Sequence, residues 1–457
     1  MVHYFYLTKW MWRIEGKMAN HSYPINEAGN LMIGGVDATV LAEQYGTPLY
    51  VYDVERIRQQ CRGFVDTFKT LGVRAQVAYA SKAFSTIAIV QVMKEEGLSL
   101  DVVSKGELYT ALKAGFPPEK IHFHGNNKTI DELTMAIEAN IGCIIVDNFY
   151  ELELLEEILQ TKQKTMDILF RVTPGIESET HQYIMTGNED SKFGFNLQNN
   201  QINEAYELVK QYKHIQLKGI HSHIGSQIFN TKSFTLAIDM LFELLQQWHE
   251  QDQFIPEVLN VGGGFGIRYT EDDEPLPSEH YVKAIVKTIQ SHVHDMQIPM
   301  PEIWIEPGRS IVGEAGTTLY TVGSMKNIPN VRKYISVDGG MADNIRPALY
   351  EAKYDGILAN KATEKCQETV SVAGKCCESG DMLIWDIDLP KVEHNDILAM
   401  FSTGAYGYSM ASNYNRFEKP AVVFVENGQA QLVVKRESLD DLIDNDLPYS
   451  SSVSTGT

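Results

Sequence analysis

A strict alternation of short apolar runs and longer amphipathic segments fills the middle of this 457-residue chain. Short runs of β-branched and apolar residues indicate strands, and the segments between them have the apolar spacing of helices. Eight strands are predicted in this way, at residues 76–81, 100–104, 121–125, 142–147, 167–173, 218–224, 258–262 and 302–306. Helices are predicted between them, among them Glu107–Ala114, Asp131–Ala139, Glu151–Gln160, Asn203–Tyr212, Ser233–Gln251 and Glu279–His292.

Eight such units over about 235 residues match the size of a (β/α)8 barrel, which typically needs about 250 residues. An open, doubly wound sheet is the alternative, and it is disfavoured because no G-x-G-x-x-G motif follows the first strand. We therefore expect a (β/α)8 TIM barrel over residues 56–311. Because such barrels carry their chemistry at the C-terminal ends of the strands, we expect the functional residues there.

The pattern changes after about residue 312, where strand-like runs come with turn signals. Asn427-Gly428 is a strong hairpin pair. We expect a C-terminal β-sandwich or barrel domain over residues 312–436, and Leu49–Tyr52, within an N-terminal segment 25–55, is a candidate to join it as a strand. Residues 1–24 are expected to be an extension, and residues 437–457 an acidic, Ser/Thr-rich tail. The predicted strands of this domain are 317–323, 333–338, 368–375, 382–387, 396–401, 420–425 and 431–435.

Composition and charge exclude several kinds of partner. The net charge of −21 disfavours nucleic acids and anionic membranes, because both repel an acidic protein. No apolar run approaches the roughly 20 residues needed to span a bilayer. The five cysteines are few, odd in number and without metal-ligand spacing, which is typical of free thiols in a reducing cytoplasm. We therefore expect a cytoplasmic protein with a small-molecule ligand.

Lys82 lies at the end of the first predicted barrel strand. A lysine at a strand end is usually just solvated, but a desolvated lysine amine is a good nucleophile toward an aldehyde cofactor. The glycine run Gly262–Gly266 after the seventh strand can bring backbone N–H groups onto a phosphate. Arg309, after the eighth strand, offers a fixed fork for an oxyanion.

Two further strand-end residues extend this interpretation. Glu306 could pair with a protonated ring nitrogen, or it could form a surface salt bridge instead. His223 could lie flat against an aromatic ring, or it could be a satisfied core histidine. The histidines do not stand at metal-ligand spacing with carboxylates, so we expect no zinc site. Together with Lys82 and the glycine run, these residues indicate pyridoxal 5′-phosphate.

Nine short segments carry a resemblance to a known family: Tyr79–Ala83, Asp101–Ser104, His181–Gly194, His221–Gln227, Gly262–Gly266, Glu306–Ser310, Arg346–Tyr350, Cys377–Asp381 and Gly404–Gly407. In these segments the chain resembles the fold-type III pyridoxal-phosphate decarboxylases, and within them the diaminopimelate decarboxylases. The resemblance covers nearly the whole chain from about residue 25 to residue 435.

The resemblance implies a role for each matching position. Lys82 would hold the internal aldimine, His223 would stack on the cofactor ring, and Glu306 would pair with the ring nitrogen. The remaining cofactor contacts would come from Asp101, Ser226, Gly263, Gly264, Gly308, Arg309 and Tyr406. The substrate would be bound by Arg309, Arg346, Tyr350, Glu378 and Tyr406.

Cys377 would be the general acid, and the resemblance implies that the partner subunit of a homodimer delivers it to a shared active site. A cysteine, with an ordinary pKa of about 8.5, can donate a proton at neutral pH. Adjacent residues on a strand point to opposite faces, so we expect only one of Cys376 and Cys377 to face the site. We assign Cys377 to the chemistry, because it adjoins Glu378, and Cys376 to packing.

The implied reaction is the decarboxylation of meso-2,6-diaminopimelate to L-lysine and carbon dioxide, the last step of lysine biosynthesis. Two arginines and a tyrosine suit the bidentate capture of a carboxylate, and Glu378 suits a distal ammonium. Decarboxylases of ornithine, arginine or carboxynorspermidine are alternatives with the same chemistry. A catalytically inactive regulatory homologue is an alternative from another class.

Overall fold

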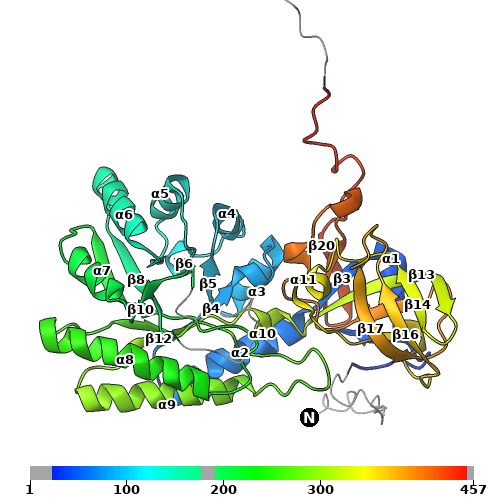
Figure 1. Cartoon of the computed structure of the whole chain (residues 1–457), viewed down its shortest axis with the longest axis horizontal. Coiled ribbons are helices and arrows are strands. Elements are labelled where there is room, and N and C mark those ends of the chain that lie inside the picture. Colours follow the sequence, from blue (N-terminus) through cyan, green and yellow to red (C-terminus); the bar gives the residue numbers. More distant parts are fainter. Residues whose placement is uncertain (1–22, 176–190, 450–457) are drawn as a thin grey trace, which may run out of the picture.

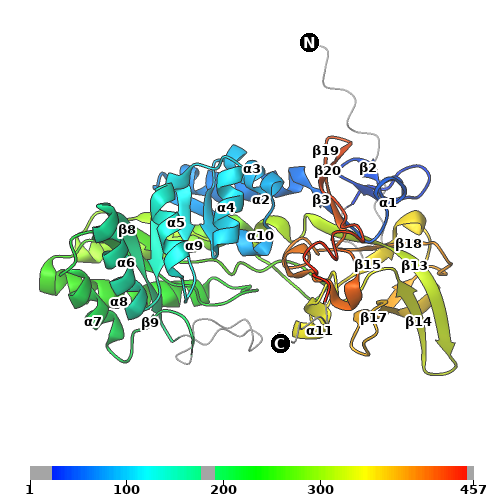
Figure 2. The same cartoon turned by 90° about the horizontal axis from the view of Figure 1, so that it is seen from above.

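The computed structural model describes residues 23–175 and 191–449 of the chain. Most of the expected N-terminal extension, the end of the acidic tail and most of the segment His181–Gly194 therefore lie outside the described residues. The described part contains two large sheets, which belong to two bodies lying side by side in Figures 1 and 2. None of its helices has the length and apolar character needed to cross a membrane.

Eight parallel strands close into a barrel, because β10 pairs with β8 on one side and with β11 on the other. The two-residue strand β9 (Phe195–Asn196) extends β8 at one end. All eight predicted strands are confirmed, with ends shifted by three residues or fewer. They are β4 (Ala75–Ala80), β5 (Ser99–Val102), β6 (Ile121–Phe123), β7 (Cys143–Val146), β8 (Met166–Thr173), β10 (Ile215–His221), β11 (Val258–Asn260) and β12 (Glu302–Ile305).

Helices surround the barrel, as the left-hand body of Figure 1 shows. The helix α2 precedes the first barrel strand, and the others follow the strands in turn, so the six predicted helices are confirmed. Three of the six predicted helices begin at a side-chain cap, since Ser104, Thr129 and Asn148 each accept a hydrogen bond from the backbone at the start of the helix. The helices are α2 (Val54–Leu71), α3 (Ile87–Glu95), α4 (Lys105–Lys113), α5 (Ile130–Ala139), α6 (Phe149–Lys162), α7 (Gln201–Val209), α8 (Lys232–Asp252), α9 (Ser278–Met296) and α10 (Arg309–Val312).

The second body is a nine-stranded sheet around the long strand β13 (Gly316–Ile328). The strand β3 (Leu49–Asp53) lies between β13 and β19, so the expected N-terminal strand of the β domain is confirmed. The other strands are β14 (Arg332–Val337), β15 (Gly356–Leu358), β16 (Glu368–Ala373), β17 (Met382–Leu389), β18 (Ile397–Met400), β19 (Ala421–Glu426) and β20 (Gln429–Val434). The hairpin of β1 (Met32–Ile33) and β2 (Val36–Asp37) and the helices α1 (Ala38–Tyr45) and α11 (Arg346–Tyr350) also belong to this body.

The predicted turn at Asn427-Gly428 is confirmed. Glu426 pairs with Gln429 across it, and both turn residues have positive φ, +52° for Asn427 and +75° for Gly428. A two-residue hairpin with positive φ at both positions matches the right-handed twist of its strands, which is why an Asn-Gly pair favours it. The boundaries drawn between the domains at residues 55 and 311 stay predictions.

Candidate active site

A cavity of about 530 Å3 lies at the C-terminal ends of the barrel strands, and residues of both bodies line it. Its position agrees with the rule that barrel chemistry gathers at this end. Eleven of the residues singled out in the sequence line it, namely Lys82, Asp101, His223, Ser226, Gly264, Glu306, Gly308, Arg309, Arg346, Tyr350 and Tyr406. Gly263, Cys377 and Glu378 are not among the lining residues.

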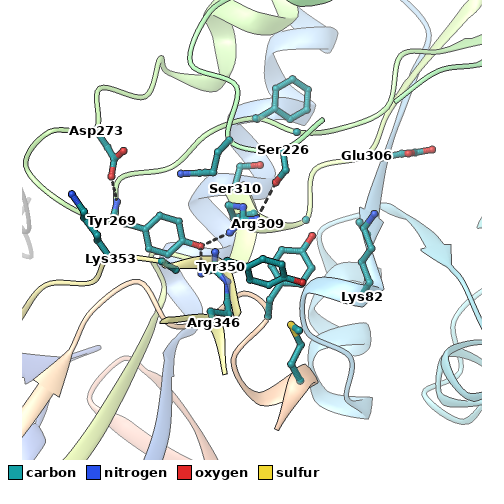
Figure 3. A pocket seen from close by; sticks show the side chains of 18 of the residues that line it. Lys82, Ser226, Tyr269, Asp273, Glu306, Arg309, Ser310, Arg346, Tyr350 and Lys353 are labelled. Carbon is teal, nitrogen blue, oxygen red and sulfur yellow. Dashed lines mark hydrogen bonds between the residues drawn. The ribbon is translucent and has the colours of Figure 1, made fainter. Parts of the chain in front are cut away.

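Lys82 lies in the short turn Ser81–Ala83 that follows β4. The last four residues of β4 are buried, but the side chain of Lys82 is exposed. The turn that follows the strand carries this side chain into the cavity, which Lys82 lines. In Figure 3, Lys82 and Glu306 lie on one side of the cavity, and Arg309, Tyr269 and Arg346 lie on the other.

Glu306 is buried, so the alternative of a surface salt bridge is wrong. Its Oε2 lies 3.1 Å from His221 Nε2, and its Oε1 lies 3.1 Å from His124 Nε2. The amide of Asn260 donates a further hydrogen bond to Oε1 at 2.6 Å. Burial alone would raise the pKa of Glu306, but His124 and His221 hold it well below its usual range. Glu306 is therefore an oriented carboxylate.

His221 is held as a neutral donor to this carboxylate. Burial lowers the pKa of His221 to about 4, although Glu306 opposes the shift. Since an ionised carboxylate can only accept, the proton of the neutral ring lies on Nε2, facing Glu306.

The cluster of His124, His221 and Glu306 bears on the expectation, drawn from residue spacing along the chain, that the protein has no zinc site. One ligand atom from each residue lies within 4.8 Å of the other two, a geometry that could hold a metal ion. Linear spacing gave no sign of this, because the three residues come from the ends of three different strands, β6, β10 and β12. Spacing along the chain is thus no basis for excluding a metal site here.

His223 lies two residues beyond β10 on the wall of the cavity. Desolvation, followed by the charges of Lys82 and Arg171, holds the pKa of His223 well below its usual value, so the ring is neutral at pH 7. Its Nδ1 accepts a hydrogen bond from the backbone N–H of Gly263 at 3.2 Å. A neutral, anchored imidazole at this wall is suited to lie against a ring without adding charge.

The glycine run Gly262–Gly266 is explained first by close packing of the strand-end loops. A Cβ at Gly263 would lie 2.0 Å from the carbonyl oxygen of Glu306, and one at Gly264 would lie 2.3 Å from that of Gly225. The φ of Gly264 is +100°, a backbone conformation that residues with a side chain rarely adopt. Packing therefore accounts for glycine at these positions, and Gly264 in addition borders the cavity.

Arg309 and Ser310 place polar atoms without partners at the cavity. Arg309 is buried and donates from Nη2 to Ser226 Oγ at 2.9 Å. Among the described residues, Arg309 Nε and Ser310 Oγ are buried without a hydrogen-bond partner. The Arg309 guanidinium also lies 4.8 Å from the centre of the Tyr406 ring. Since buried polar groups are normally paired, these atoms mark a place where an anion would complete the bonding.

The β domain contributes a second arginine to the same cavity. Arg346 opens the helix α11, is buried, and donates to the hydroxyl of Tyr354 at 2.6 Å. Tyr350, at the other end of α11, also lines the cavity. The expected grouping of Arg309, Arg346 and Tyr350 is therefore present, and it brings together residues from both bodies (Figure 3).

Comparison with known proteins agrees with this geometry. The family model of the pyridoxal-dependent decarboxylase, pyridoxal binding domain, matches residues 54–313, more than half of the chain. The chain is 61% identical over 428 residues to the diaminopimelate decarboxylase of Bacillus subtilis (strain 168), covering 94% of this chain and 98% of that protein. The chain belongs to the diaminopimelate decarboxylase family.

Two further relatives extend the comparison. The diaminopimelate decarboxylase of Bacillus methanolicus is 62% identical over 415 residues, with 91% of this chain and 96% of that protein covered. The crystal structure of diaminopimelate decarboxylase from M. jannaschii in co-complex with L-lysine has a TM-score of 0.87 and 36% identity, with 93% of this chain and 97% of that chain covered. The expected family and the expected fold are confirmed.

The residues present fit pyridoxal phosphate, the cofactor that this family implies. An amine at Lys82, an ionised carboxylate at Glu306 and a neutral ring at His223 border one cavity. The unpartnered donors of Arg309 and Ser310 supply the place for an anion.

Cys377 and Glu378 lie in the connection between β16 and β17 and do not line the cavity. Cys376 and Cys377 are part of a turn rather than a strand, so the reasoning from alternating strand faces was wrong. The two side chains nevertheless differ in burial as expected, since Cys376 is buried and Cys377 is exposed. Burial raises the pKa of Cys376 to about 11, which makes its thiol a poor proton donor at neutral pH.

Two strand-end residues have structural rather than chemical roles, and two residues at the site, Asn260 and Tyr269, had not been singled out from the sequence. Ser104 and Asn148 stand at strand ends but are helix caps. Asn260 is the last residue of β11, and a polar side chain at a strand end was the signal available for it. Tyr269 had no such signal, because it lies nine residues beyond its strand, in a loop whose course the sequence does not specify.

Proposed function

We propose that this protein is a pyridoxal phosphate-dependent decarboxylase that converts meso-2,6-diaminopimelate into L-lysine and carbon dioxide. The observation that carries the proposal is the pair of buried guanidiniums, Arg309 and Arg346, across the cavity from Lys82. A substrate with a second carboxylate would use both, whereas ornithine, which has only one carboxylate, would leave them without a partner. The relatives named diaminopimelate decarboxylase and the L-lysine complex of the M. jannaschii protein support the same substrate.

The cofactor would be held by residues on all sides of the cavity. Lys82 Nζ would be the covalent attachment point, Glu306 would accept the hydrogen bond of the ring nitrogen, and His223 would lie against the ring. Ser226, Gly264 and Arg309 would hold the phosphate. When bound, pyridoxal phosphate supplies a pyridinium ring that accepts the electron pair left by the departing carboxylate. The remaining proposed cofactor contacts are Asp101, Gly263, Gly308 and Tyr406.

The substrate would be oriented by its far end. Arg309, Arg346 and Tyr350, assisted by Tyr406, would bind the distal carboxylate, and Glu378 would bind the distal ammonium. With that end fixed, the carboxylate to be lost lies at the other end of the molecule, near Lys82. The thiol of Cys377 would then donate its proton to the carbon that has lost carbon dioxide.

Cys377 and Glu378 would reach the site from a partner subunit. Both are exposed and neither lines the cavity of its own chain. A homodimer in which each β16–β17 connection completes the partner's cavity would bring them to the substrate. The five free cysteines fit a reaction in the cytoplasm.

The proposal is tested by the dependence of the reaction on its cofactor. Protein from which bound cofactor has been removed should release little carbon dioxide from diaminopimelate, and added pyridoxal phosphate should restore the reaction. Release that is independent of the cofactor would contradict the proposal.

Replacing Glu306 by glutamine should leave the cofactor bound but slow turnover. The side chain keeps its shape, but the negative charge opposite the ring nitrogen is gone, and we expect kcat to fall about 100-fold, the scale of losing one preorganised electrostatic contact. The matched control is Glu302→Gln, which changes a glutamate at the opposite end of the same strand, where it accepts hydrogen bonds from Gln76 and Trp304. Steady-state turnover assays measure kcat, and the visible spectrum of the cofactor measures its binding. An unchanged kcat for Glu306→Gln would refute the role of Glu306.

A further inference from the structure

Tyr269 connects the barrel to the β domain at the wall of the cavity. It lies in the loop after β11, yet its ring is buried in a hydrophobic cluster formed mostly by β-domain side chains. The ring packs edge-to-face against Tyr354, with the centroids 5.3 Å apart and the planes at 89°. Tyr269 thus belongs to the barrel by sequence and to the β domain by packing.

The phenol oxygen of Tyr269 joins the two arginines of the cavity. Arg309 Nη1 donates to it at 2.5 Å and Arg346 Nη1 donates to it at 2.9 Å, as the dashed lines in Figure 3 show. Both guanidiniums also lie over its ring, 5.7 Å from the centroid for Arg309 and 4.9 Å for Arg346. One oxygen atom therefore sets the spacing between a barrel arginine and a β-domain arginine.

The loop that carries Tyr269 is fixed on both sides of the residue. The carboxylate of Asp273 accepts the backbone N–H groups of Tyr269 at 3.0 Å and Thr270 at 2.9 Å. Before it, the side chain of Gln227 binds the backbone of Ile267 twice, accepting from its N–H at 2.9 Å and donating to its carbonyl at 3.1 Å. The backbone that carries the phenol is therefore anchored by hydrogen bonds that do not involve the arginines.

The electrostatics agree with a phenol that serves the two cations. Burial alone would raise the pKa of Tyr269, but Arg309 and then Arg346 lower it below its ordinary value. Two guanidiniums that donate to the same oxygen atom lie close enough to repel each other, and the partial negative charge of that shared acceptor offsets the repulsion. Arg309 donates one N–H of Nη1 to Tyr269 and one of Nη2 to Ser226, and each of these nitrogens carries a second N–H, so donor capacity is left for a ligand.

We propose that Tyr269 is a positioning residue for the distal carboxylate of the substrate. Its phenol oxygen holds Arg309 and Arg346 so that their remaining N–H groups converge on one carboxylate, and the residue thereby favours ligands that carry that group. This inference rests on the proposed function, which assigns the two arginines to the distal carboxylate.

Two ligands that differ only in the distal carboxylate isolate this effect. L-Lysine, the product, keeps the distal carboxylate, whereas cadaverine is the same five-carbon diamine without it. Wild-type holoenzyme should therefore be inhibited more strongly by L-lysine than by cadaverine. In Tyr269→Phe, which keeps the ring and its packing, the Ki for L-lysine should rise about tenfold, the scale of a lost hydrogen bond to a charged group, while that for cadaverine stays within about twofold.

The same variant should show a split between the kinetic constants. We expect KM for diaminopimelate to rise about tenfold, while kcat stays within about threefold, because the reacting end of the substrate is not touched. The matched control is Tyr281→Phe, which removes another buried tyrosine hydroxyl, one that donates to the carbonyl of Ile228 at 2.8 Å and does not contact either arginine. Tyr281→Phe should leave the L-lysine to cadaverine ratio unchanged.

The outcomes separate this inference from the proposed function. If wild-type protein does not decarboxylate diaminopimelate, the proposed function fails whatever Tyr269 does. If wild-type protein does so and prefers L-lysine over cadaverine, an unchanged ratio in Tyr269→Phe overturns the role of Tyr269 alone. Tighter L-lysine binding by Tyr269→Phe would also overturn it, because the phenol would then compete with the carboxylate.

Discussion

Replacing Lys82 by alanine is expected to abolish carbon dioxide release from diaminopimelate and to remove the visible absorbance of the lysine-linked cofactor. Lys82 extends into the cavity on the same side as Glu306, and its amine is the proposed attachment point. Alanine has no nucleophilic nitrogen, so the covalent link cannot form. Absorbance spectra of the purified protein and carbon dioxide release assays measure the two effects.

A second lysine of the cavity provides the control. Lys353 lines the same cavity but lies on its far side, near Tyr269 (Figure 3). Lys353→Ala should keep the absorbance of the linked cofactor, because its amine is not the attachment point. A Lys82→Ala protein that retains both absorbance and turnover would exclude Lys82 as the cofactor lysine.

Replacing Cys377 by alanine is expected to leave the cofactor bound and to slow turnover steeply. The side chain is exposed and lies outside the cavity of its own chain, so cofactor binding does not require it. Loss of a general acid typically costs about 10²- to 10⁴-fold, and we expect kcat to fall within that range. The measurement is kcat for diaminopimelate at saturating cofactor, together with the visible spectrum.

Replacing the neighbouring cysteine, Cys376, by alanine distinguishes loss of the proton donor from a disturbance of the surrounding structure. Cys376 is buried, and burial raises its pKa to about 11. Cys376→Ala should therefore keep kcat near that of the wild type, with a loss of about 1 kcal/mol in the free energy of unfolding, as is typical of point substitutions. If Cys376→Ala lowered kcat as far as Cys377→Ala, the assignment of the proton donor to Cys377 would be wrong.

Mixing two inactive variants tests the shared active site. Lys82→Ala and Cys377→Ala subunits, allowed to exchange, should form mixed dimers in which one cavity has both Lys82 and the partner subunit's Cys377. Random pairing then restores about a quarter of the wild-type activity, as expected for a two-fold symmetric dimer with exchanged residues. No recovery in a mixture shown to contain mixed dimers would contradict delivery across the interface.

The barrel could be predicted from the sequence because its signal is local and repeated. Each strand is a short apolar run and each helix has its own amphipathic spacing, so errors stay within a few residues at the ends. The three-residue strand β15 was missed because Gly356–Leu358 is too short to show a period. The lysine, the strand-end glutamate and Arg309 could likewise be named, because strand ends converge in a barrel. Arg346 lies in the β domain and was named only through the family resemblance.

The contacts among those residues could not be predicted, because they depend on closure of the barrel and on the placement of the β domain. Glu306 is oriented by His124, His221 and Asn260, which come from three other strands of the barrel. Tyr269 contacts Arg309, 40 residues further along the chain, within the barrel, and Arg346, 77 residues further along, across the contact between the two bodies. No local pattern encodes either arrangement.

The selection of diaminopimelate as the substrate is tested most directly by one assay. Carbon dioxide release should be measured from meso-2,6-diaminopimelate, L-ornithine and L-arginine with pyridoxal phosphate present, for the wild type and for Arg346→Ala. We predict that the wild-type kcat/KM for diaminopimelate exceeds those for the other two by at least about 1,000-fold, because buried charges left unpaired by the wrong substrate are costly. Arg346→Ala should reduce that preference. A wild-type enzyme that decarboxylates ornithine or arginine as well as diaminopimelate would contradict the account.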